Sequence, residues 1–323
     1  MSQTPPTLTP HVAAIVNPRS GGGRTGRGWR LINDALEAEL GPVRAQFTTS
    51  TSTPHYLPAA ELTRNALKSG AQLVIAVGGD GTINEVVNGF FENGTAINPD
   101  AHLAILNTGT GGDFRKTFDM PAELEGCVKR IGAGTTRQID LGRLTFVSED
   151  GGAGTRYFNN IASFGLSGDV VRAVNRASFS KLFGGAFAFL WATLATAWRY
   201  KPHAVRLQSD TGFDDTLNVG MCAVANGRFF GGGMMIAPDA EPDDGIFDVV
   251  IMRDTKFSDM LTGSGALRDG THLQNPKVLH FQARTLTATP VGAAHVRLDV
   301  DGEAPGRLPA RFEILPAAIT LRC

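Results

Sequence analysis

A glycine-rich turn with one carboxylate, Gly78-Gly79-Asp80-Gly81-Thr82, is the part of this chain best suited to chemistry. It follows the apolar run 73–77 and precedes residues 83–90, whose apolar side chains fall on one helical face. Such a turn directs backbone N–H groups and a helix N-terminus at one point, which suits a phosphate. The Asp80 carboxylate would repel that phosphate unless a divalent cation lay between them. The turn therefore predicts a nucleotide site with Mg²⁺.

Two more glycine-rich segments follow apolar runs, at 17–23 after 12–16 and at 107–114 after 103–106. In an open α/β sheet the carboxyl ends of the strands share one edge, so the three loops can converge on one ligand. A single loop of this kind is equally compatible with an ordinary strand–turn–helix corner. The chain has neither a dinucleotide-binding G-x-G-x-x-G fingerprint nor a G-x-x-x-x-G-K-[ST] loop.

Carboxylates near strand ends are the candidates for holding metal and moving a proton. We expect Asp113 and Asp140 to join Asp80 at the sheet edge and to hold water and Mg²⁺ there, although all three also suit turns or helix caps. Glu303, in Asp301-Gly302-Glu303, follows the run 296–300, and the glycine permits a sharp turn that exposes the acid. A carboxylate so placed can accept the proton of a hydroxyl, or it can be a simple hairpin residue.

The ordered motifs resemble the diacylglycerol kinase catalytic family over nearly the whole chain, from about residue 12 to the end. They are Asn17-Pro-Arg-Ser-Gly21, the segments 78–85 and 109–114, the acidic segment 238–247, and Asp301-Gly-Glu303. The family includes soluble bacterial diacylglycerol kinases and the sphingosine and ceramide kinases. One departure is Gly112, where most members have Asn. The resemblance implies ATP-dependent phosphorylation of a lipid hydroxyl with Mg²⁺.

The resemblance also implies roles for particular residues. Glu303 would be the proton acceptor, and a second Mg²⁺ would be held by the Asp244 carboxylate and the backbone carbonyls of Glu241 and Ile246, fixing a loop. Residues expected to contact ATP are Asn17, Pro18, Arg19, Ser20, Gly21, Thr48, Gly79, Asp80, Gly81, Thr82, Ile83, Asn84, Glu85 and Thr110.

Composition narrows the alternatives. The 30 Lys and Arg against 31 Asp and Glu give no basic field for nucleic acid. Cys127, Cys222 and Cys323 are widely spaced, which fits reduced cytoplasmic thiols and argues against zinc. The apolar stretch 182–198 is shorter than the roughly 20 apolar residues that a transmembrane helix needs. With arginines such as Arg172 and Arg199 nearby, it favours peripheral, reversible contact with a membrane.

These patterns predict an α/β protein of two domains. Strands at 12–17, 43–48, 73–77 and 102–106 alternate with helices at 26–40, 55–69, 82–92 and 121–132, which predicts a parallel-sheet, Rossmann-like domain over 1–140, similar to NAD kinase and phosphofructokinase. After 140, short runs separated by Gly, Asp and Pro predict a β-rich antiparallel domain over 141–323. The resemblance to the diacylglycerol kinase family further implies that residues 308–323 return to the first domain.

The function predicted from the sequence is transfer of the γ-phosphoryl group of ATP to a hydroxyl of a membrane lipid. Diacylglycerol is the default acceptor, with ceramide, sphingoid bases and phosphatidylglycerol left open, because apolar pockets discriminate weakly among acyl chains. Two alternatives remain: a soluble-substrate kinase of the NAD kinase type, and an inactive module that binds nucleotide or lipid. The sequence leaves open whether the chain is a monomer or a homodimer.

Overall fold

The computed structural model describes residues 11–49, 57–177, 196, 198–254 and 265–323, so most of the apolar stretch 182–198 lies outside the described residues. Contacts divide the chain into unit 1, Met1–Ile139 with Ile319–Cys323, and unit 2, Asp140–Ala318. Of the segment 308–323, which was expected to return, only the residues from Ile319 onward belong to unit 1. Within the described residues, no helix is both long and apolar enough to cross a membrane.

Unit 1 is built on a parallel sheet. Its strands lie in the order β2 (Arg44–Phe47), β1 (Val12–Val16), β3 (Leu73–Gly78), β6 (His102–Asn107) and the last residues of β18 (Gly306–Arg322). Every pairing along this order is parallel. The long apolar runs of β1, β3 and β6 form strands because helices cover both faces of the sheet. The predicted fold class is confirmed here.

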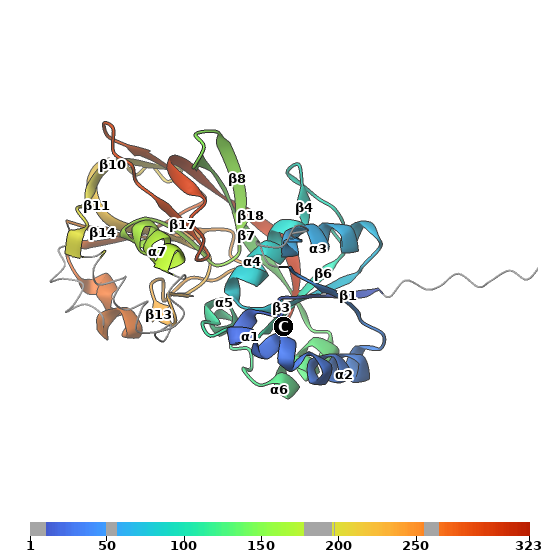
Figure 1. Ribbon diagram of the computed structural model, residues 1–323. Helices are drawn as coiled ribbons and strands as arrows, with labels where there is room; N and C mark the ends of the chain where they lie inside the picture. Colours follow the sequence, from blue (N-terminus) through green and yellow to red (C-terminus); the bar gives the residue numbers. More distant parts are fainter. Residues whose placement is uncertain (1–10, 50–56, 178–195, 197, 255–264) are drawn as a thin grey trace, which may run out of the picture. The chain divides into compact units, whose positions relative to one another are not determined.

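Helices cover the two faces of this sheet in pairs (Figure 1). On one face, α2 (Trp29–Leu40) and α6 (Leu124–Ala133) bury Ile32, Leu36 and Ile131 against the strands. On the other face lie α3 (Ala59–Lys68) and α4 (Asp80–Gly89). The helix expected at 26–40 is interrupted, since α1 (Ser20–Arg27) ends at Gly28 and α2 begins anew.

Small elements of unit 1 were not predicted. A short hairpin joins β4 (Phe91–Glu92) to β5 (Thr95–Ala96), and the single-turn helix α5 (Asp113–Thr117) follows the third glycine-rich loop. Each is too short to give a periodic pattern in the sequence.

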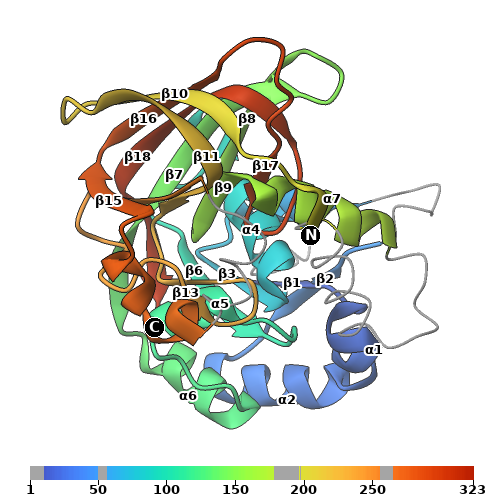
Figure 2. The same cartoon turned by 90° about the vertical axis from the view of Figure 1, so that its left-hand side faces the viewer.

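Unit 2 is antiparallel and β-rich, as predicted (Figure 2). Its strand order is β15 (Val278–Ala283), β14 (Phe247–Arg253), β11 (Asp214–Ala225), β10 (His203–Ser209), β16 (Thr285–Pro290) and β18. β9 (Ile161–Gly165) pairs with β11 and with β17 (Leu298–Val300). β7 (Thr136–Ser148) and β8 (Ala153–Phe158) form a hairpin. The remaining elements are α7 (Leu166–Ala177), β12 (Phe229–Phe230), β13 (Met234–Met235) and the 3₁₀-helix η2 (Thr271–Gln274).

The core of unit 2 combines aliphatic side chains with several phenylalanines. Phe158, Phe164, Phe247 and Phe312 are each completely buried in one cluster, and the Phe158 ring lies where a side chain on Gly142 would stand. Residues 296–300 alternate apolar and polar side chains, which is typical of a half-buried strand, yet all three residues of β17 are buried. Asp299, the polar residue of β17, is buried in the unit and accepts hydrogen bonds there.

Candidate active site

The glycine-rich loops of unit 1 leave its sheet at one level. Val16 is paired with Val77, and Val77 with Leu106, so β1, β3 and β6 reach their carboxyl ends side by side. Thr48 follows the neighbouring strand β2, and its N–H donates to the carbonyl oxygen of Val16. The expectation that these loops converge on one edge therefore matches the register of the sheet.

The first loop is fastened to the other two by polar side chains. The Asn17 Nδ2 donates to Thr82 Oγ1 at 3.0 Å, and the Thr25 hydroxyl donates to Thr108 Oγ1 at 2.6 Å. The loop then passes through Gly21, Gly22 and Gly23, whose φ values of 59°, 68° and 84° suit glycine and few other residues. Sequence reasoning missed Thr25 and Thr108, which lie 83 positions apart.

The three loops approach one another too closely for side chains. A Cβ on Gly109 would lie 2.6 Å from Cα of Gly79, and a Cβ on Gly21 would lie 2.6 Å from the carbonyl oxygen of Thr108. The Ser20 hydroxyl lies 3.6 Å from the Cβ position of Gly79. This cradle is lined by backbone and small hydroxyls, and such a lining fits a polyphosphate.

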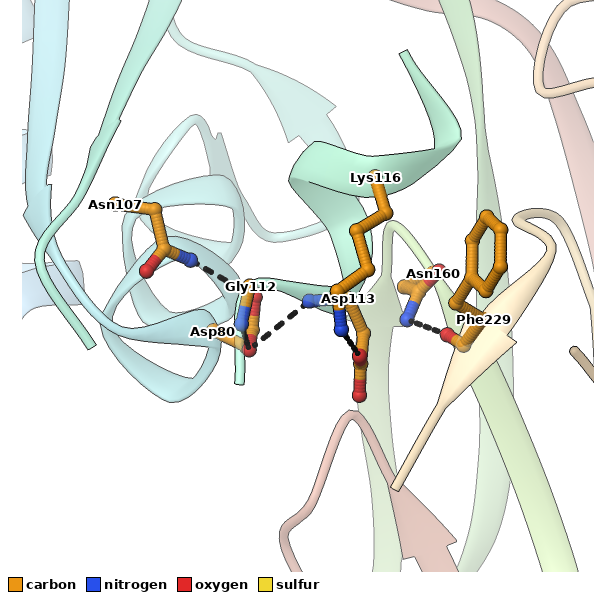
Figure 3. Close-up of polar contacts among 7 residues, drawn as sticks. All are labelled: Asp80, Asn107, Gly112, Asp113, Lys116, Asn160 and Phe229. Atoms are coloured by element: carbon orange, nitrogen blue, oxygen red, sulfur yellow. Dashed lines mark hydrogen bonds and ion pairs between the residues drawn. The ribbon is translucent and has the colours of Figure 1, made fainter. Parts of the chain in front are cut away.

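Asp80 ties the second loop to the third (Figure 3). Its Oδ1 accepts from Asn107 Nδ2 at 3.1 Å, and its Oδ2 accepts from the backbone N–H of Gly112 at 2.8 Å and of Asp113 at 3.4 Å. The Asn107 Oδ1 in turn accepts from the N–H of Gly109 at 3.0 Å. Asn107 thus connects the carboxylate to the cradle, a role that the sequence did not reveal.

The charges around Asp80 are compatible with a cation. Burial raises the pKa of Asp80, and the neighbouring Asp113 raises it further. Two carboxylates forced together in this way gain from a divalent ion placed between or beside them. Lys116 already contributes one positive charge, since its Nζ lies 2.8 Å from Asp113 Oδ1 (Figure 3). The donor set therefore fits Mg²⁺ or its bound waters.

The departure at Gly112 has a conformational explanation. Gly112 begins α5 with φ 64° and ψ 35°, in the left-handed region that glycine and asparagine adopt more readily than other residues. The three atoms nearest to a Cβ placed there belong to the Arg115 guanidinium, at 3.3 Å, and to Asn107. Glycine at this position consequently keeps the loop conformation that an asparagine would also support.

The other residues expected to contact ATP differ in their exposure and in the hydrogen bonds that they already make. Ile83 and Asn84 are completely buried, so their side chains face the interior of unit 1. The Glu85 Oε2 accepts from the N–H of Ala59 at 2.8 Å and so holds the start of α3. Arg19 and Thr110 are exposed, and Pro18, Ser20, Gly21, Thr48, Gly79 and Gly81 are partly exposed.

Asp140 is placed differently from the expectation. It lies inside β7 and not at the end of a strand, because the strand continues from Thr136 to Ser148. It belongs to unit 2, where its two carboxylate oxygens each accept a backbone N–H at 2.7 Å, from Gly245 and from Ala317. Asp140 therefore joins a loop to β18, and the idea that it closes a strand was wrong.

The acidic segment around Asp244 carries negative charge in unit 2. Partial burial raises the pKa of Asp244, with Asp248, Asp140 and Glu241 adding to the effect. The Asp244 Oδ1 accepts from the N–H of Ile246 at 3.0 Å. Across the described parts of the chain, no three His, Cys, Asp or Glu side chains group as metal ligands. A cation held by one carboxylate and backbone carbonyls, as expected for Glu241 and Ile246, needs no such group.

Glu303 is exposed just beyond a tight two-residue turn. Asp301 and Gly302 have φ values of 49° and 88°, and Val300 and Glu303 exchange backbone hydrogen bonds of 2.8 and 3.0 Å across the turn. The Asp301 carboxylate accepts the N–H groups of Asn159 at 3.0 Å and of Ile161 at 2.8 Å. The turn is thus anchored to the start of β9.

A buried carboxylate that sequence reasoning missed lies under this turn. Asp299 accepts from the N–H of Gly302 at 2.9 Å and from the Ser163 hydroxyl at 3.3 Å, and the Ser163 and Ser167 hydroxyl oxygens lie 2.8 Å apart. Burial raises the pKa of Asp299 to about 7, with Asp301 and then Glu303 adding to the effect. Its partner Ser163 lies 136 positions away, so no local pattern announces the contact.

Comparison with known proteins gives two domain matches. Residues 11–144 match the diacylglycerol kinase catalytic domain, and residues 160–323 match the YegS C-terminal NAD kinase beta sandwich-like domain. The crystal structure titled "a putative diacylglycerol kinase from Bacillus anthracis str. Sterne" matches this chain with a TM-score of 0.73 at 24% identity. The match covers 96% of this chain and 94% of that one. Similarity at this identity speaks for the fold alone.

Two curated relatives carry the comparison further. A diacylglycerol kinase of Staphylococcus epidermidis is 29% identical over 285 residues, which cover 88% of this chain and 83% of the relative. A protein of Chromohalobacter salexigens, named "Probable lipid kinase YegS-like", is 30% identical over 234 residues, which cover 70% of each. With both domain matches in the expected order, the chain belongs to the diacylglycerol kinase family of lipid kinases.

Proposed function

We propose that the chain transfers the γ-phosphoryl group of ATP, with Mg²⁺, to a hydroxyl of a membrane lipid, and that diacylglycerol is the acceptor to test first. The observation that carries the proposal is the cradle of unit 1, where three loops leave one sheet edge with no side chain between Gly79 and Gly109. The name of the S. epidermidis relative supports the choice of acceptor.

The loops of unit 1 would bind and orient the nucleotide. Backbone N–H groups near Gly79 and Gly109, with the hydroxyls of Ser20 and Thr110, would hold phosphate oxygens, and Asp80 would hold Mg²⁺ or its waters. Bound Mg²⁺ supplies neutralisation of the negative charge on the phosphates. Because phosphoryl transfer depends mainly on positioning and charge neutralisation, these groups suffice without a P-loop lysine.

Glu303 would accept the proton of the lipid hydroxyl. Support comes from its exposed position, from the resemblance of Asp301-Gly302-Glu303 to the family motif, and from the hydrogen bonds that anchor the turn. Loss of the proton makes the hydroxyl oxygen a better nucleophile, which is the usual contribution of a general base. The enzyme would work in peripheral contact with the cytoplasmic face of a membrane.

Purified protein incubated with γ-labelled ATP and Mg²⁺, and with either diacylglycerol micelles or NAD, tests the proposal. We expect labelled phosphatidic acid. Glu303→Gln should lower turnover at least about a hundredfold while leaving ATP binding unchanged, because general-base catalysis contributes on this scale. Glu92→Gln, on the exposed β4–β5 hairpin, is the matched control. Labelled NAD without labelled lipid would overturn the proposal, and a fully active Glu303→Gln enzyme would remove Glu303 as the base.

A further inference from the structure

A pocket of about 360 Å³ in unit 2 is lined by three arginines that the proposed chemistry does not use. Arg172 comes from α7, Arg297 immediately precedes β17, and Arg199 lies on the segment before β10. Asp169 is the carboxylate in the lining, which also includes Tyr200. The volume falls within the range of small-ligand sites. The pocket is therefore large enough for a headgroup and carries an excess of positive charge.

Two of the arginines are held in place by carboxylates. The Arg297 Nη1 lies 2.6 Å from Asp169 Oδ1, and the Arg172 Nη1 donates to Glu149 Oε1. Each guanidinium has five N–H donors, so one carboxylate partner leaves other donors for a ligand. Arginines fixed in this way lose less side-chain entropy when a ligand binds. These two residues are thus positioned before any ligand arrives.

The third arginine has unused binding capacity. Arg199 is exposed, and among the residues that the structure describes it has no carboxylate within ion-pair distance. The three arginines against Asp169 and Glu149 leave a net charge of one positive. Burial raises the pKa of Tyr200, so its phenol stays neutral and adds no negative charge. The pocket as a whole favours an anion.

We propose that this pocket binds the phosphate group of a membrane phospholipid. The proposal rests on the proposed function, since a lipid kinase works where phosphate is the prevailing anion. Guanidinium groups match the oxygens of phosphate in paired hydrogen bonds, and three of them around one pocket suit its several oxygens. Diacylglycerol carries no phosphate, so with that acceptor the phosphate comes from a neighbouring phospholipid. With phosphatidylglycerol as acceptor, the acceptor itself can supply it through the same contacts.

Vesicle flotation without ATP tests the binding step on the full chain. The vesicles are digalactosyldiacylglycerol, a bilayer-forming lipid without phosphate, containing either phosphatidylglycerol or, at equal surface charge, oleate, which is anionic and likewise lacks phosphate. We expect tighter binding to phosphatidylglycerol. Arg199→Gln should weaken it about tenfold and abolish the preference over oleate, because a charge-assisted hydrogen bond is lost. Arg206→Gln is the control, since this β10 arginine pairs with Asp214 outside the pocket.

The results distinguish a phosphate-binding pocket from general electrostatic attraction to the membrane. Equal binding to phosphatidylglycerol and oleate vesicles, or equal losses in the two variants, would show general electrostatic attraction and overturn the phosphate pocket. Labelled ATP then identifies the source of the phosphate. Label on phosphatidylglycerol would show that phosphatidylglycerol is the acceptor. Faster labelling of added diacylglycerol would show that phosphatidylglycerol binds in the pocket without being phosphorylated. Failure of all lipid phosphorylation would reject the proposed function and leave the ATP-free binding result standing.

Discussion

Replacing the buried Asp299 by Asn should stabilise the protein, and more so at higher pH. Asp299 is only 9% exposed, and its carboxylate accepts hydrogen bonds from Gly302 and Ser163. An Asn side chain of the same shape can keep its oxygen on the Gly302 N–H. Its amide can donate to Ser163 Oγ, which leaves the single Ser163 hydroxyl proton for Ser167 Oγ. The substitution therefore removes the charge and keeps the hydrogen bonds.

The magnitude follows from the pKa of Asp299, which is raised from its ordinary value of 3.8 to about 7. Between these values the unfolded chain has released the proton and the folded protein has kept it, so the stability of the wild type falls as pH rises. A tenfold change in a proton-binding constant corresponds to about 1.4 kcal/mol, which makes the total loss about 4 kcal/mol at pH 8. Asp299→Asn should avoid this loss. The difference in free energy of unfolding between Asp299→Asn and the wild type should be near zero below pH 4, increase up to pH 7 and then stay constant.

Urea unfolding followed by circular dichroism at several pH values between 4 and 8 measures the effect. Asp34→Asn is the control, because this carboxylate is 67% exposed and should give a difference of less than about 0.5 kcal/mol at every pH. A stability difference for Asp299→Asn that does not change with pH would refute the reasoning. Destabilisation at pH 8 would show that the turn needs the ionised carboxylate.

The remaining predictions concern three other positions. Gly109→Ala places a Cβ 2.6 Å from Cα of Gly79 in the facing loop. It should therefore lower the free energy of unfolding by about 1–3 kcal/mol, measured by thermal unfolding, and weaken ATP binding. Gly265→Ala is the control, because no atom lies within 4 Å of the added Cβ, and it should behave as wild type. Gly112→Asn should keep lipid kinase activity, whereas Gly112→Val should lose it, since only the first tolerates φ 64°. The hydrogen bond that His280 Nε2 donates to Asp248 Oδ1 raises the pKa of His280 above 6.5, so this pair stabilises the folded protein below that pH, and the stabilisation fades as the pH rises through the raised pKa. His280→Ala should therefore destabilise by about 1 kcal/mol more at pH 6 than at pH 9 in urea titrations, and an equal cost at both pH values would contradict this.

The sequence predicted those elements whose signal is local. The unbroken apolar runs at 12–16, 73–77 and 103–106, each followed by glycine, identified the parallel strands and the edge where their loops meet. The turn at Asp301-Gly302 was predictable for the same reason, because glycine after a strand marks a sharp turn. Local spacing was enough wherever consecutive residues determine the conformation.

Features that depend on distant partners escaped prediction. Asp140 has the appearance of a strand-end residue, yet its carboxylate partners are 105 and 177 positions away, and only the folded chain shows that β7 continues past it. Asp299 occupies what looks like the polar position of an alternating strand, and hydrogen bonds across the unit bring it inside. The long strand β18 was obscured by Pro309 and Pro316, which commonly interrupt strands.

The path of the chain has a consequence for how the protein is made. Unit 2 is an insertion: the chain leaves unit 1 after Ile139 and re-enters it at Ile319, so the strand segment that pairs with β6 is synthesised after the whole of unit 2. Until those residues leave the ribosome, β6 keeps an unpaired edge, and such edges invite wrong pairing with other chains. Unit 2 can complete its contacts earlier. A nascent chain stalled shortly before Ile319 would thus have a folded unit 2 and an incomplete sheet in unit 1, which the pairing of Thr320–Arg322 with β6 would complete.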